Sequence, residues 1–548
     1  MYLDEVQLCN ELASHTKNNK FVFVYFSMGN LLPYRRSNLQ SIYLLSIFSN
    51  QQMNRFGLNV LLRPIVDDFK MLERGVTLNI SGLPKVVFGT LTAVVADNLA
   101  SHQIGGFKCG FSSGYRKCRT CLATPYKIQS YFYDSDFVAR TKQDHDDHVE
   151  SAKIEELKAY FTRLYGLNGD SILNELEYFH VIGGLVPDVM HDVLEGVLPL
   201  TICELLLHCI KKKYFTLKEI NSAVSNFKYG YQEVKDKPSS IDLYHSKNKR
   251  LRQSAAQTWQ LATLIPLMFG HKIPYHDLNF FCFTRLLEVC RLIFMESFTP
   301  SDVTNLANLI ADFLLQFKTS FDRNLTPKMH HLVHYPRYIR LIGPLYAFWC
   351  MRYEAKHSYF KQLQRNIRNF IDVPLTLTMR HQQWQCQKFK AAGENLMGVK
   401  FTMPKSVPVS LVNLSCGGQI AEQLNIDNLY HIVQRVKWVQ IGTTQFKVDD
   451  SIILCSLNGG RPSQFGMVVD IITCQGQLRL ICKLFRTKFF NKHLQAFRIT
   501  NRESVCHLAI SPLELPNFKV YSAHDPSFIR PIGTDFYVTS KTEISQLV

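Results

Sequence analysis

Glu354 is the acidic residue whose surroundings most favour chemistry. A helix is predicted from Arg352 to about Phe370, and it must end before Pro374. Whole-turn spacing puts these side chains on one face: Glu354, Lys361, Arg365 and Arg368. The apolar face is predicted to hold Tyr353, Phe360, Leu363, Ile367 and Phe370. A carboxylate heading a basic stripe, with Arg352 beside it, suits metal chemistry next to phosphates; an amphipathic helix with a solvated polar face is the alternative.

Two further acids lie close to strand candidates. Asp97 directly follows Lys85–Ala96, an apolar run predicted to be one long strand, and Asp4 follows a very short apolar start. A carboxylate at a strand end meets water or a metal ion, but aspartate is also a common turn former. Neither acid carries a hypothesis alone.

Cys118 and Cys121 form a CxxC motif in a glycine-containing basic loop. Two thiolates at this spacing can bind one zinc ion, which needs four ligands in a closed structural site. The candidates for the remaining ligands are Cys109, His180 and His191. Two free thiols are an equally good interpretation, whereas the thioredoxin-like context of a redox CxxC is missing.

Other histidine and aspartate groups are weaker signals. Asp188 and His191 stand three residues apart at the entry to a helix. We interpret the cluster of His330, His331 and His334 as structural, because histidines beside apolar helices are more often satisfied core residues than ligands. The run 144–148 (DHDDH) is predicted to be a solvated face.

The surrounding elements predict an α/β fold followed by a separate β domain. Phe21–Phe26 is a strand candidate, and Ser37–Phe48 and Leu58–Leu72 carry helical spacing. The expected segments are 1–192, core strands and helices with the CxxC loop; 193–326, a helical insertion; 327–390, the late helix with Glu354; 391–430, a linker; and 431–548, a small β-barrel or sandwich.

The net charge of +17 indicates a polyanionic partner, and nucleic acid is the commonest one. A membrane surface is the rival, but no basic amphipathic stretch supports it, and the apolar stretches Val193–Ile210 and Leu278–Met295 are interrupted by charges. The fifteen cysteines, mostly in apolar segments, are typical of reduced thiols inside the cell. With no signal peptide expected at the acidic start, we predict a nuclear or cytoplasmic protein.

The order of the motifs resembles the catalytic region of CACTA/En-Spm-type DDE transposases, from residue 2 to about 385. The family's Y-x-D-D/E strand resembles Tyr2–Glu5, and its G-D-N-x-x-x-H, G-G-F and C-R-x-C elements resemble residues 96–121. Its D-x-x-H signature matches Asp188 and His191, and its PK-x-H-x-x-x-H-x-P and R-x-E-x-K-H elements match Pro327–Pro336 and Arg352–His357. The family's N-P-L-G proline and glycine are replaced here by Glu11 and Ala13.

The resemblance implies an RNase H-like core, interrupted by a helical insertion, that cleaves and joins DNA. It makes Asp4, Asp97 and Glu354 the catalytic acids that bind two Mg²⁺ ions, the first on strand one and the second at the end of strand four. DNA is the expected partner, self-association stays open, and no small-molecule substrate is expected. The alternative is a catalytically inactive, transposase-derived protein that binds DNA or protein. A zinc hydrolase using Cys118, Cys121 and His191 fits less well, since two thiolates make the metal less Lewis-acidic.

Overall fold

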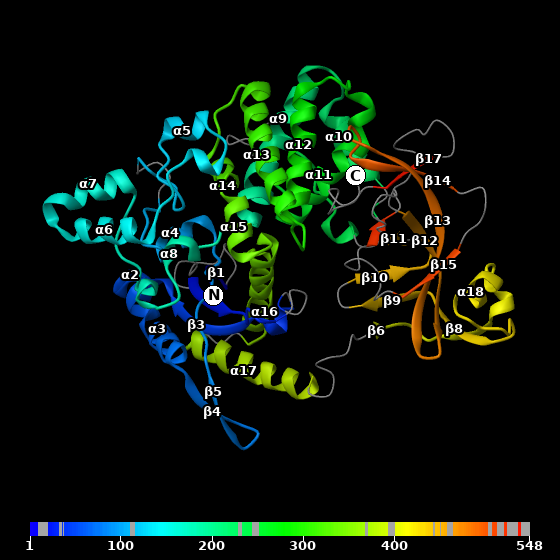
Figure 1. Ribbon diagram of the computed structural model, residues 1–548, viewed down its shortest axis with the longest axis horizontal. Coiled ribbons are helices and arrows are strands. Elements are labelled where there is room, and N and C mark those ends of the chain that lie inside the picture. Colours follow the sequence, from blue (N-terminus) through cyan, green and yellow to red (C-terminus); the bar gives the residue numbers. More distant parts are fainter. Residues whose placement is uncertain are drawn as a thin grey trace. The chain divides into compact units, whose positions relative to one another are not determined.

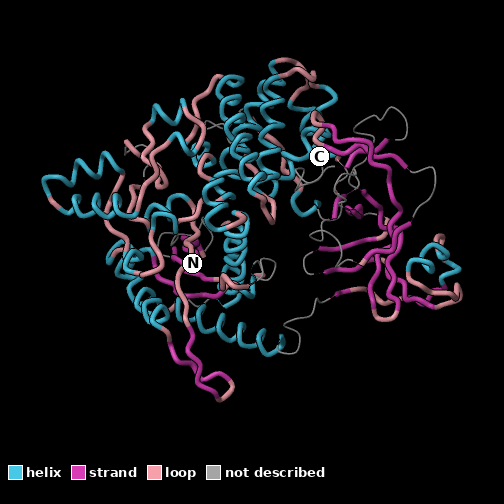
Figure 2. Tube along the Cα trace, in the orientation of Figure 1, coloured by secondary structure: helices cyan, strands magenta, loops and turns pink. Residues whose placement is uncertain are grey.

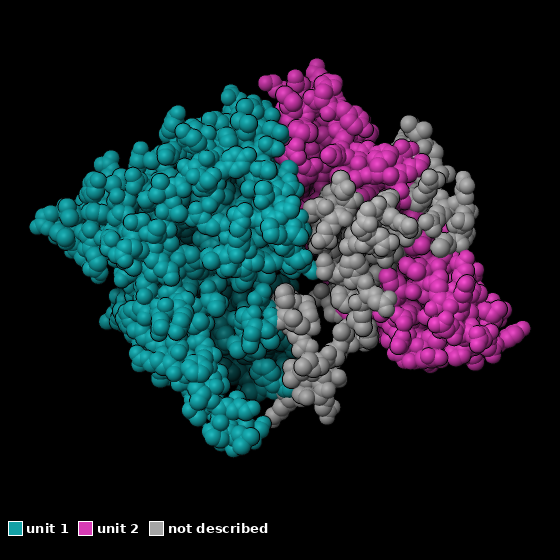
Figure 3. Space-filling model, in the orientation of Figure 1, with its two compact units in different colours: residues 1–197, 293–396 teal, residues 198–292, 397–548 magenta. Residues whose placement is uncertain are grey.

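A computed structural model of the chain defines two compact units, which are described separately (Figure 3). Unit 1 comprises residues 1–197 and 293–396, and unit 2 comprises residues 198–292 and 397–548. The structure describes residues 1–8, 20–31, 36, 38–109, 115–227, 229, 233–243, 251–367, 371–392, 401–441, 444–449, 451–456, 464–501, 507–511, 520–522 and 535–538.

The centre of unit 1 is a mixed β-sheet that begins with three antiparallel strands (Figure 1). They are β1 (Tyr2–Gln7), β2 (Lys20–Phe26) and β3 (Tyr43–Ser49), in the order β1-β2-β3. Two short parallel segments extend this sheet past β1: Val95 pairs with Tyr2, and Leu185 pairs with Val94. Backbone hydrogen bonds support both pairs, including Val95 N to Met1 O and Val94 N to Gly184 O, each 2.8 Å. The resulting order is β3, β2, β1, the segment at 94–95 and the segment at 185.

The sheet is apolar on both faces because helices cover both. Leu3, Val22 and Val24 belong to one buried core together with α3 (Leu58–Arg74). On the opposite face, the alternate residue Tyr2 stacks on Tyr353 of α16 (Met351–Ile367), with ring centroids 4.7 Å apart. Burial on both faces explains the nearly continuous apolar sequence of β2.

The remaining elements of unit 1 are mostly helical. They are α2 (Asn50–Phe56), β4 (Val76–Ile80), β5 (Leu83–Val87), α4 (Asn98–Ile104), α5 (Pro125–Ser130), α6 (Lys142–Lys153), α7 (Glu155–Tyr165), α8 (Val181–Gly184), the π-helical segment η5 (Met190–Val197), α13 (Pro300–Phe321), α14 (Pro327–Leu332), α15 (Tyr335–Ile342) and α17 (Val373–Ala392). Figures 1 and 2 show the β4–β5 hairpin extending away from the rest of its unit.

Unit 2 joins a group of helices to the C-terminal strands. The helices are α9 (Leu198–Lys211), α10 (Leu217–Asn226), α11 (Ala255–Phe269), α12 (Leu278–Ile293) and α18 (Gly417–Gln423). The strands are β6 (Phe401–Thr402), β7 (Val407–Ser410), β8 (Ile432–Val436), β9 (Trp438–Ile441), β10 (Thr444–Lys447), β11 (Ser451–Ser456), β12 (Gln464–Cys474), β13 (Gln477–Asn491), β14 (Ala496–Asn501), β15 (His507–Ile510), β16 (Val520–Ser522) and β17 (Asp535–Val538). Nine of them form one antiparallel sheet. The buried guanidinium of Arg291 on α12 donates to Gln495, next to β14, so helices and strands share one interior.

The predicted mixture of helix and sheet is confirmed, including the strand at β2 and the helix at α3. The helix predicted for Ser37–Phe48 is wrong over its second half: Leu39–Ser41 form only a short 3-10 turn, and Tyr43–Phe48 belong to β3, because pairing with β2 along Phe21–Phe26 outweighs their helical spacing. The single strand predicted for Lys85–Ala96 is also wrong. Its first part belongs to β5, and only Val94 and Val95 pair within the sheet.

The predicted segment borders fall differently from the two units. The helices expected in one insertion, 193–326, are divided, because residues 198–292 cluster with unit 2 and residues 293–326 with unit 1. Part of the expected linker, 391–430, is folded: Leu411 and Ile420 are fully buried in a core with strands β8, β12 and β13. The run 144–148 lies within α6: Asp144, Asp146 and Asp147 are exposed as predicted, whereas His145 is buried against Phe107 and His180.

Within the described residues, one continuous helical stretch, Met190–Lys211, has the length and composition of a membrane span. It is 56% buried inside the protein. Asp192 near its start is fully buried and hydrogen-bonded, which is typical of a core helix in a folded protein.

Candidate metal centres

Four side chains from two distant parts of the sequence meet in a buried Cys2His2 cluster. Cys118 and Cys121 lie in a loop that pairs with a neighbouring segment at Ala139, and His330 and His334 lie one helical turn apart at α14 and the start of α15. All four are buried, and one ligand atom from each lies within 4.8 Å of the other three.

The contacts within the cluster fit a single metal ion. Cys118 Sγ lies 3.5 Å from His334 Nε2, Cys121 Sγ lies 3.2 Å from His330 Nε2, and the two Nε2 atoms are 3.3 Å apart. The Thr120 N–H lies 3.4 Å from Cys118 Sγ, where it can stabilise a thiolate. Two thiolates and two imidazoles are a common tetrahedral ligand set for zinc.

A carboxylate outside the cluster orients one of its histidines. Asp134 Oδ1 lies 2.6 Å from His334 Nδ1, and Arg337 forms an ion pair with the same carboxylate at 2.7 Å. Zinc-bound histidines usually donate their second ring nitrogen in this way, which fixes the tautomer that presents Nε2 to the metal.

The ionisation of the two cysteines also fits a metal site. Burial raises the pKa of Cys118, but hydrogen bonding from Cys121 and the nearby charge of His334 outweigh burial and lower that pKa well below its usual range. Burial and the neighbouring Cys118 raise the pKa of Cys121. One thiolate is therefore favoured, and the second needs a bound cation. The cluster can hold a metal ion such as zinc.

The predicted partners of the CxxC motif lie elsewhere. His191 pairs with Asp188, His180 Nε2 lies 3.0 Å from Asp146, and the half-buried thiol of Cys109 contacts a backbone carbonyl. The prediction that His191 joins Cys118 and Cys121 is wrong, as is the purely structural interpretation of His330 and His334. The helical HxxxH spacing was the signal for the true partners.

Asp4 lies on β1, and Asp97 follows the segment that pairs with β1. Tyr2 pairs with Val95 in parallel, and each acid follows its paired residue by two positions. Alternation along β1 places the Asp4 carboxylate on the same face as Tyr2, which α16 covers. Asp4 is held there by His357 of α16, with Oδ2 to Nε2 at 3.1 Å, and by the Tyr2 hydroxyl at 2.9 Å. Asp97 is the N-cap of α4, where its Oδ1 accepts from Ala100 N at 2.6 Å.

Glu354 faces a group of charged side chains. Its Oε1 lies 3.5 Å from His191 Nε2, which also lies 3.9 Å from Glu195. Burial raises the pKa of Glu354; His191 opposes this, whereas Asp4, Glu195 and Asp188 add to it, and the result is about 7. Asp4 and Glu354 therefore share one electrostatic cluster, whereas Asp97 is related to Asp4 through the Tyr2–Val95 pair. Glu195 was missed in the sequence, although the spacing from Asp188 through His191 to Glu195 places all three on one helical face.

Asp188 anchors this cluster from within the protein. Only 1% exposed, it accepts hydrogen bonds from Met190 N, His191 N and Cys350 N, and its Oδ2 lies 2.5 Å from His191 Nδ1. Burial lowers the pKa of His191, but the hydrogen bond to Asp188 and the surrounding carboxylates raise it overall to about 9. His191 is therefore a cation at neutral pH, held between Asp188 and Glu354.

Helix α16 differs in part from its prediction. The basic residues Arg352 and Lys361 are half-buried and Arg365 is exposed, whereas Arg368 lies outside the described residues. The buried residues of the helix are Tyr353, Lys356, His357, Phe360 and Gln364. The predicted apolar face is thus wrong for Leu363 and Ile367, which are only half-buried; Ile367 ends the helix, and Phe370 is not described. Two polar side chains are buried here because each has a partner. His357 contacts Asp4, and the Lys356 ammonium lies over the rings of Tyr359 and Trp384.

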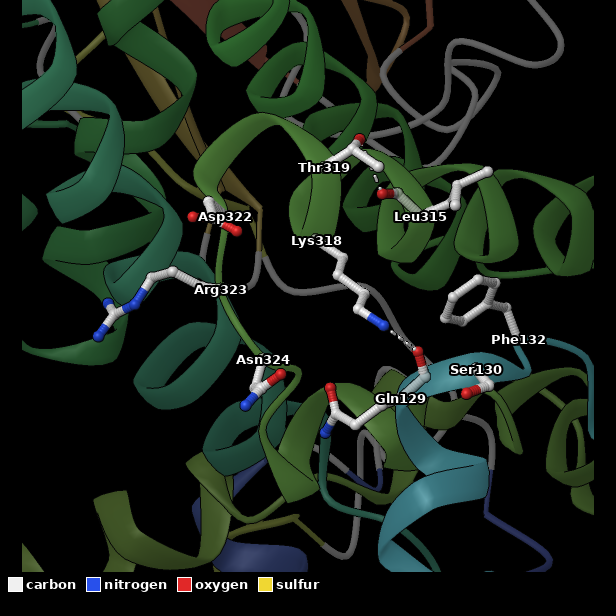
Figure 4. Close-up of a pocket in the computed structure, with 9 residues that line it drawn as sticks. All are labelled: Gln129, Ser130, Phe132, Leu315, Lys318, Thr319, Asp322, Arg323 and Asn324. Carbon is white, nitrogen blue, oxygen red and sulfur yellow. Dashed lines mark hydrogen bonds between the residues drawn. The ribbon is translucent and has the colours of Figure 1, made fainter.

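A cavity of about 660 Å³ lies between α5 and the C-terminal end of α13 (Figure 4). Its lining includes Lys318, Asp322, Arg323 and Phe132, and Lys318 Nζ donates to Gln129 O at 2.7 Å. None of the predicted catalytic acids or cluster ligands lines it, so this cavity is separate from both candidate centres.

No family model and no curated protein sequence matches this chain.

Proposed function

We propose that the protein is the core of a DDE-type DNA transposase, a polynucleotidyl transferase that acts on DNA phosphodiesters through Asp4, Asp97 and Glu354. One observation carries the proposal: Asp4 and Asp97 each follow the parallel pair Tyr2–Val95 by two residues, and the charge of Asp4 acts on Glu354 of α16, the helix that stacks on Tyr2.

The order of the sheet supports an RNase H-like core. The first acid lies on β1, the second lies two residues after Val95 in the fourth segment of the sheet, and the third lies on a late helix after a long helical stretch. The resemblance to CACTA-type transposases implies these same three locations.

The acids suit Mg²⁺ because they offer hard oxygen ligands. The pKa of Glu354, raised to about 7 by burial and by neighbouring carboxylates, indicates that a cation would stabilise this cluster. Two bound Mg²⁺ ions would supply activation of the attacking hydroxyl and stabilisation of the leaving oxygen. His357 and His191 would hold Asp4 and Glu354 in place.

DNA is the proposed partner, and the net charge of +17 favours it. Arg352, Lys361 and Arg365 extend from Glu354 along α16 and would contact the phosphates that flank the reacting bond. A protein that acts on chromosomal DNA would work in the nucleus.

The second candidate is an inactive derivative that keeps the fold and binds DNA or protein. One observation favours it: each acid already has a partner within the protein. Asp4 contacts His357, Glu354 contacts His191, and Asp97 caps α4. These contacts would preserve the acids as structural residues without any metal.

Cleavage of DNA tests the choice between the two. We expect Mg²⁺- or Mn²⁺-dependent nicking of supercoiled plasmid and strand transfer with a terminal-inverted-repeat duplex, reduced at least about 100-fold in D4N, D97N and E354Q. The matched control is E5Q, because Glu5 neighbours Asp4 but forms its ion pair with Lys20. DNA binding without cleavage in the wild type would support the inactive derivative. Cleavage that persists in E354Q would refute the site.

A further inference from the structure

A buried polar network lies between the Cys2His2 cluster and the acids. Arg119 Nη1 donates to Asn98 Oδ1 at 2.8 Å, and Asn98 Nδ2 donates to Asp192 Oδ1 at 2.7 Å. The same Asp192 oxygen lies 3.1 Å from His331 Nδ1, and Asp192 Oδ2 accepts from the Tyr335 hydroxyl at 3.3 Å.

The four members Arg119, Asn98, Asp192 and His331 each adjoin a residue of one centre. Arg119 follows Cys118, and His331 follows His330, so two members are fixed to ligands of the cluster. Asn98 follows Asp97, and Asp192 follows His191, so the other two are fixed to the acid site.

Burial makes this network cooperative. Asp192 is completely buried, and Arg119, His331 and Asn98 are at most 6% exposed. A buried carboxylate must keep its hydrogen bonds and its neighbouring cations, because an uncompensated buried charge costs several kcal/mol. Movement of one member therefore displaces the others rather than leaving Asp192 without partners.

We propose that metal binding at Cys118, Cys121, His330 and His334 positions the acid site through Arg119, Asn98, Asp192 and His331. The role of this coupling in catalysis rests on the proposed function. The coupling itself is a physical link between two parts of unit 1 and can be measured without any activity. A bound metal fixes the backbone at Cys118 and His330 and hence the side chains of Arg119 and His331. These hold Asn98 and Asp192, and with them the strand end at Asp97 and the π-helical segment that carries His191.

A second contact links the same parts. Lys328, two residues before His330, donates from Nζ to the backbone carbonyl of His191 at 2.6 Å. The Cα of Gly196 lies against this lysine, and a methyl group there would come within 2.4 Å of Lys328 Cδ. The π-helical segment is thus packed against α14, the helix that supplies His330 to the cluster.

Hydrogen exchange measures the coupling without needing any activity. The full chain is compared zinc-loaded and zinc-stripped, with amides of α4 and of residues 190–197 as the readout. We expect zinc to slow their exchange at least about tenfold, because local opening requires the network to break. The strand pair β12–β13 in unit 2 serves as the internal control and should not change. The zinc content of the loaded sample is measured first. Equal exchange of α4 and residues 190–197 in the zinc-loaded and zinc-stripped protein would then overturn the coupling.

Substitution of Arg119 tests the route. In zinc-loaded R119M, exchange in α4 and residues 190–197 should rise to the zinc-stripped level, and R119K should restore part of the protection. The matched control is R337M: Arg337 pairs with Asp134 behind His334 and outside the network, so once saturated with zinc this variant should behave as wild type. Wild-type protection in zinc-loaded R119M would refute this route.

Binding of Mn²⁺ separates this inference from the proposed function. In the wild type, zinc loading should tighten Mn²⁺ binding, measured by electron paramagnetic resonance, about tenfold. Absence of Mn²⁺ binding in every state would refute the acid site, while zinc-dependent protection of α4 would still support the coupling. Mn²⁺ binding of equal strength with and without zinc would refute the coupling alone.

Discussion

Asp4 and Asp97 each lie two residues beyond the parallel pair that Tyr2 forms with Val95. This relationship connects the start of the chain with the end of an apolar segment almost a hundred residues later. It is set by backbone hydrogen bonds, such as Val95 N to Met1 O at 2.8 Å, and so does not depend on side-chain rotamers.

The Cys2His2 cluster predicts one zinc ion per chain. Elemental analysis should find it in wild-type protein, and C121S or H330A should lose it and lower the free energy of unfolding by several kcal/mol, since metal binding contributes to folding. Substitution with Co²⁺ should give the visible absorption of a tetrahedral site. C109S and H191A are the controls, and both should keep one zinc. Zinc loss in H191A with the fold intact would contradict the assignment.

The buried carboxylate of Asp188 predicts a large loss of stability when it is removed. D188A leaves three backbone N–H groups and the cationic His191 without their acceptor and should cost about 3–5 kcal/mol. D188N keeps an acceptor oxygen and should cost less. The exposed Asp67 is the control, and D67A should stay within about 0.5 kcal/mol of wild type by denaturant unfolding. Equal stability of D188A and wild type would show that this anchor is unimportant.

His145 predicts an acid-dependent loss of stability. Burial lowers the pKa of His145 to about 4, against 6.5 in the unfolded chain, and the nearby charges of His180 and Arg140 add to this effect. The unfolded state therefore binds the proton more tightly, so the contribution is present above about pH 6.5 and is lost as the pH falls towards 4. In H145F this part of the loss, up to about 3 kcal/mol, should vanish.

Wild type and H145F are compared by urea unfolding at pH 8, where both side chains are neutral, and at pH 4.5. Loss of zinc in acid affects both proteins and cancels in the difference. The control H276F exchanges an exposed imidazole and should follow wild type. Parallel pH profiles for wild type and H145F would contradict the lowered pKa.

The sequence shows local structure more readily than long-range contacts. The β2 strand was predictable because its apolar run is long and β-branched, whereas β3 was mistaken for a helix because pairing with β2 decides its form. The CxxC motif was visible, but its partner His334 lies 216 residues from Cys118, and no local pattern states that they meet. Asp188 and His191 were recognised by their spacing. Glu195 was not, because an acid on a helix face is common.

Mn²⁺ in a crystal tests the central claim most directly. Crystals of the zinc-loaded protein soaked in Mn²⁺ are measured at the manganese absorption edge. We predict anomalous peaks about 2.2 Å from carboxylate oxygens of Asp4 and Asp97, with Glu354 at the second of two ions spaced about 3.5–4 Å apart. Absence of manganese from these carboxylates, or acids too far apart to share an ion, would contradict the proposed transposase site.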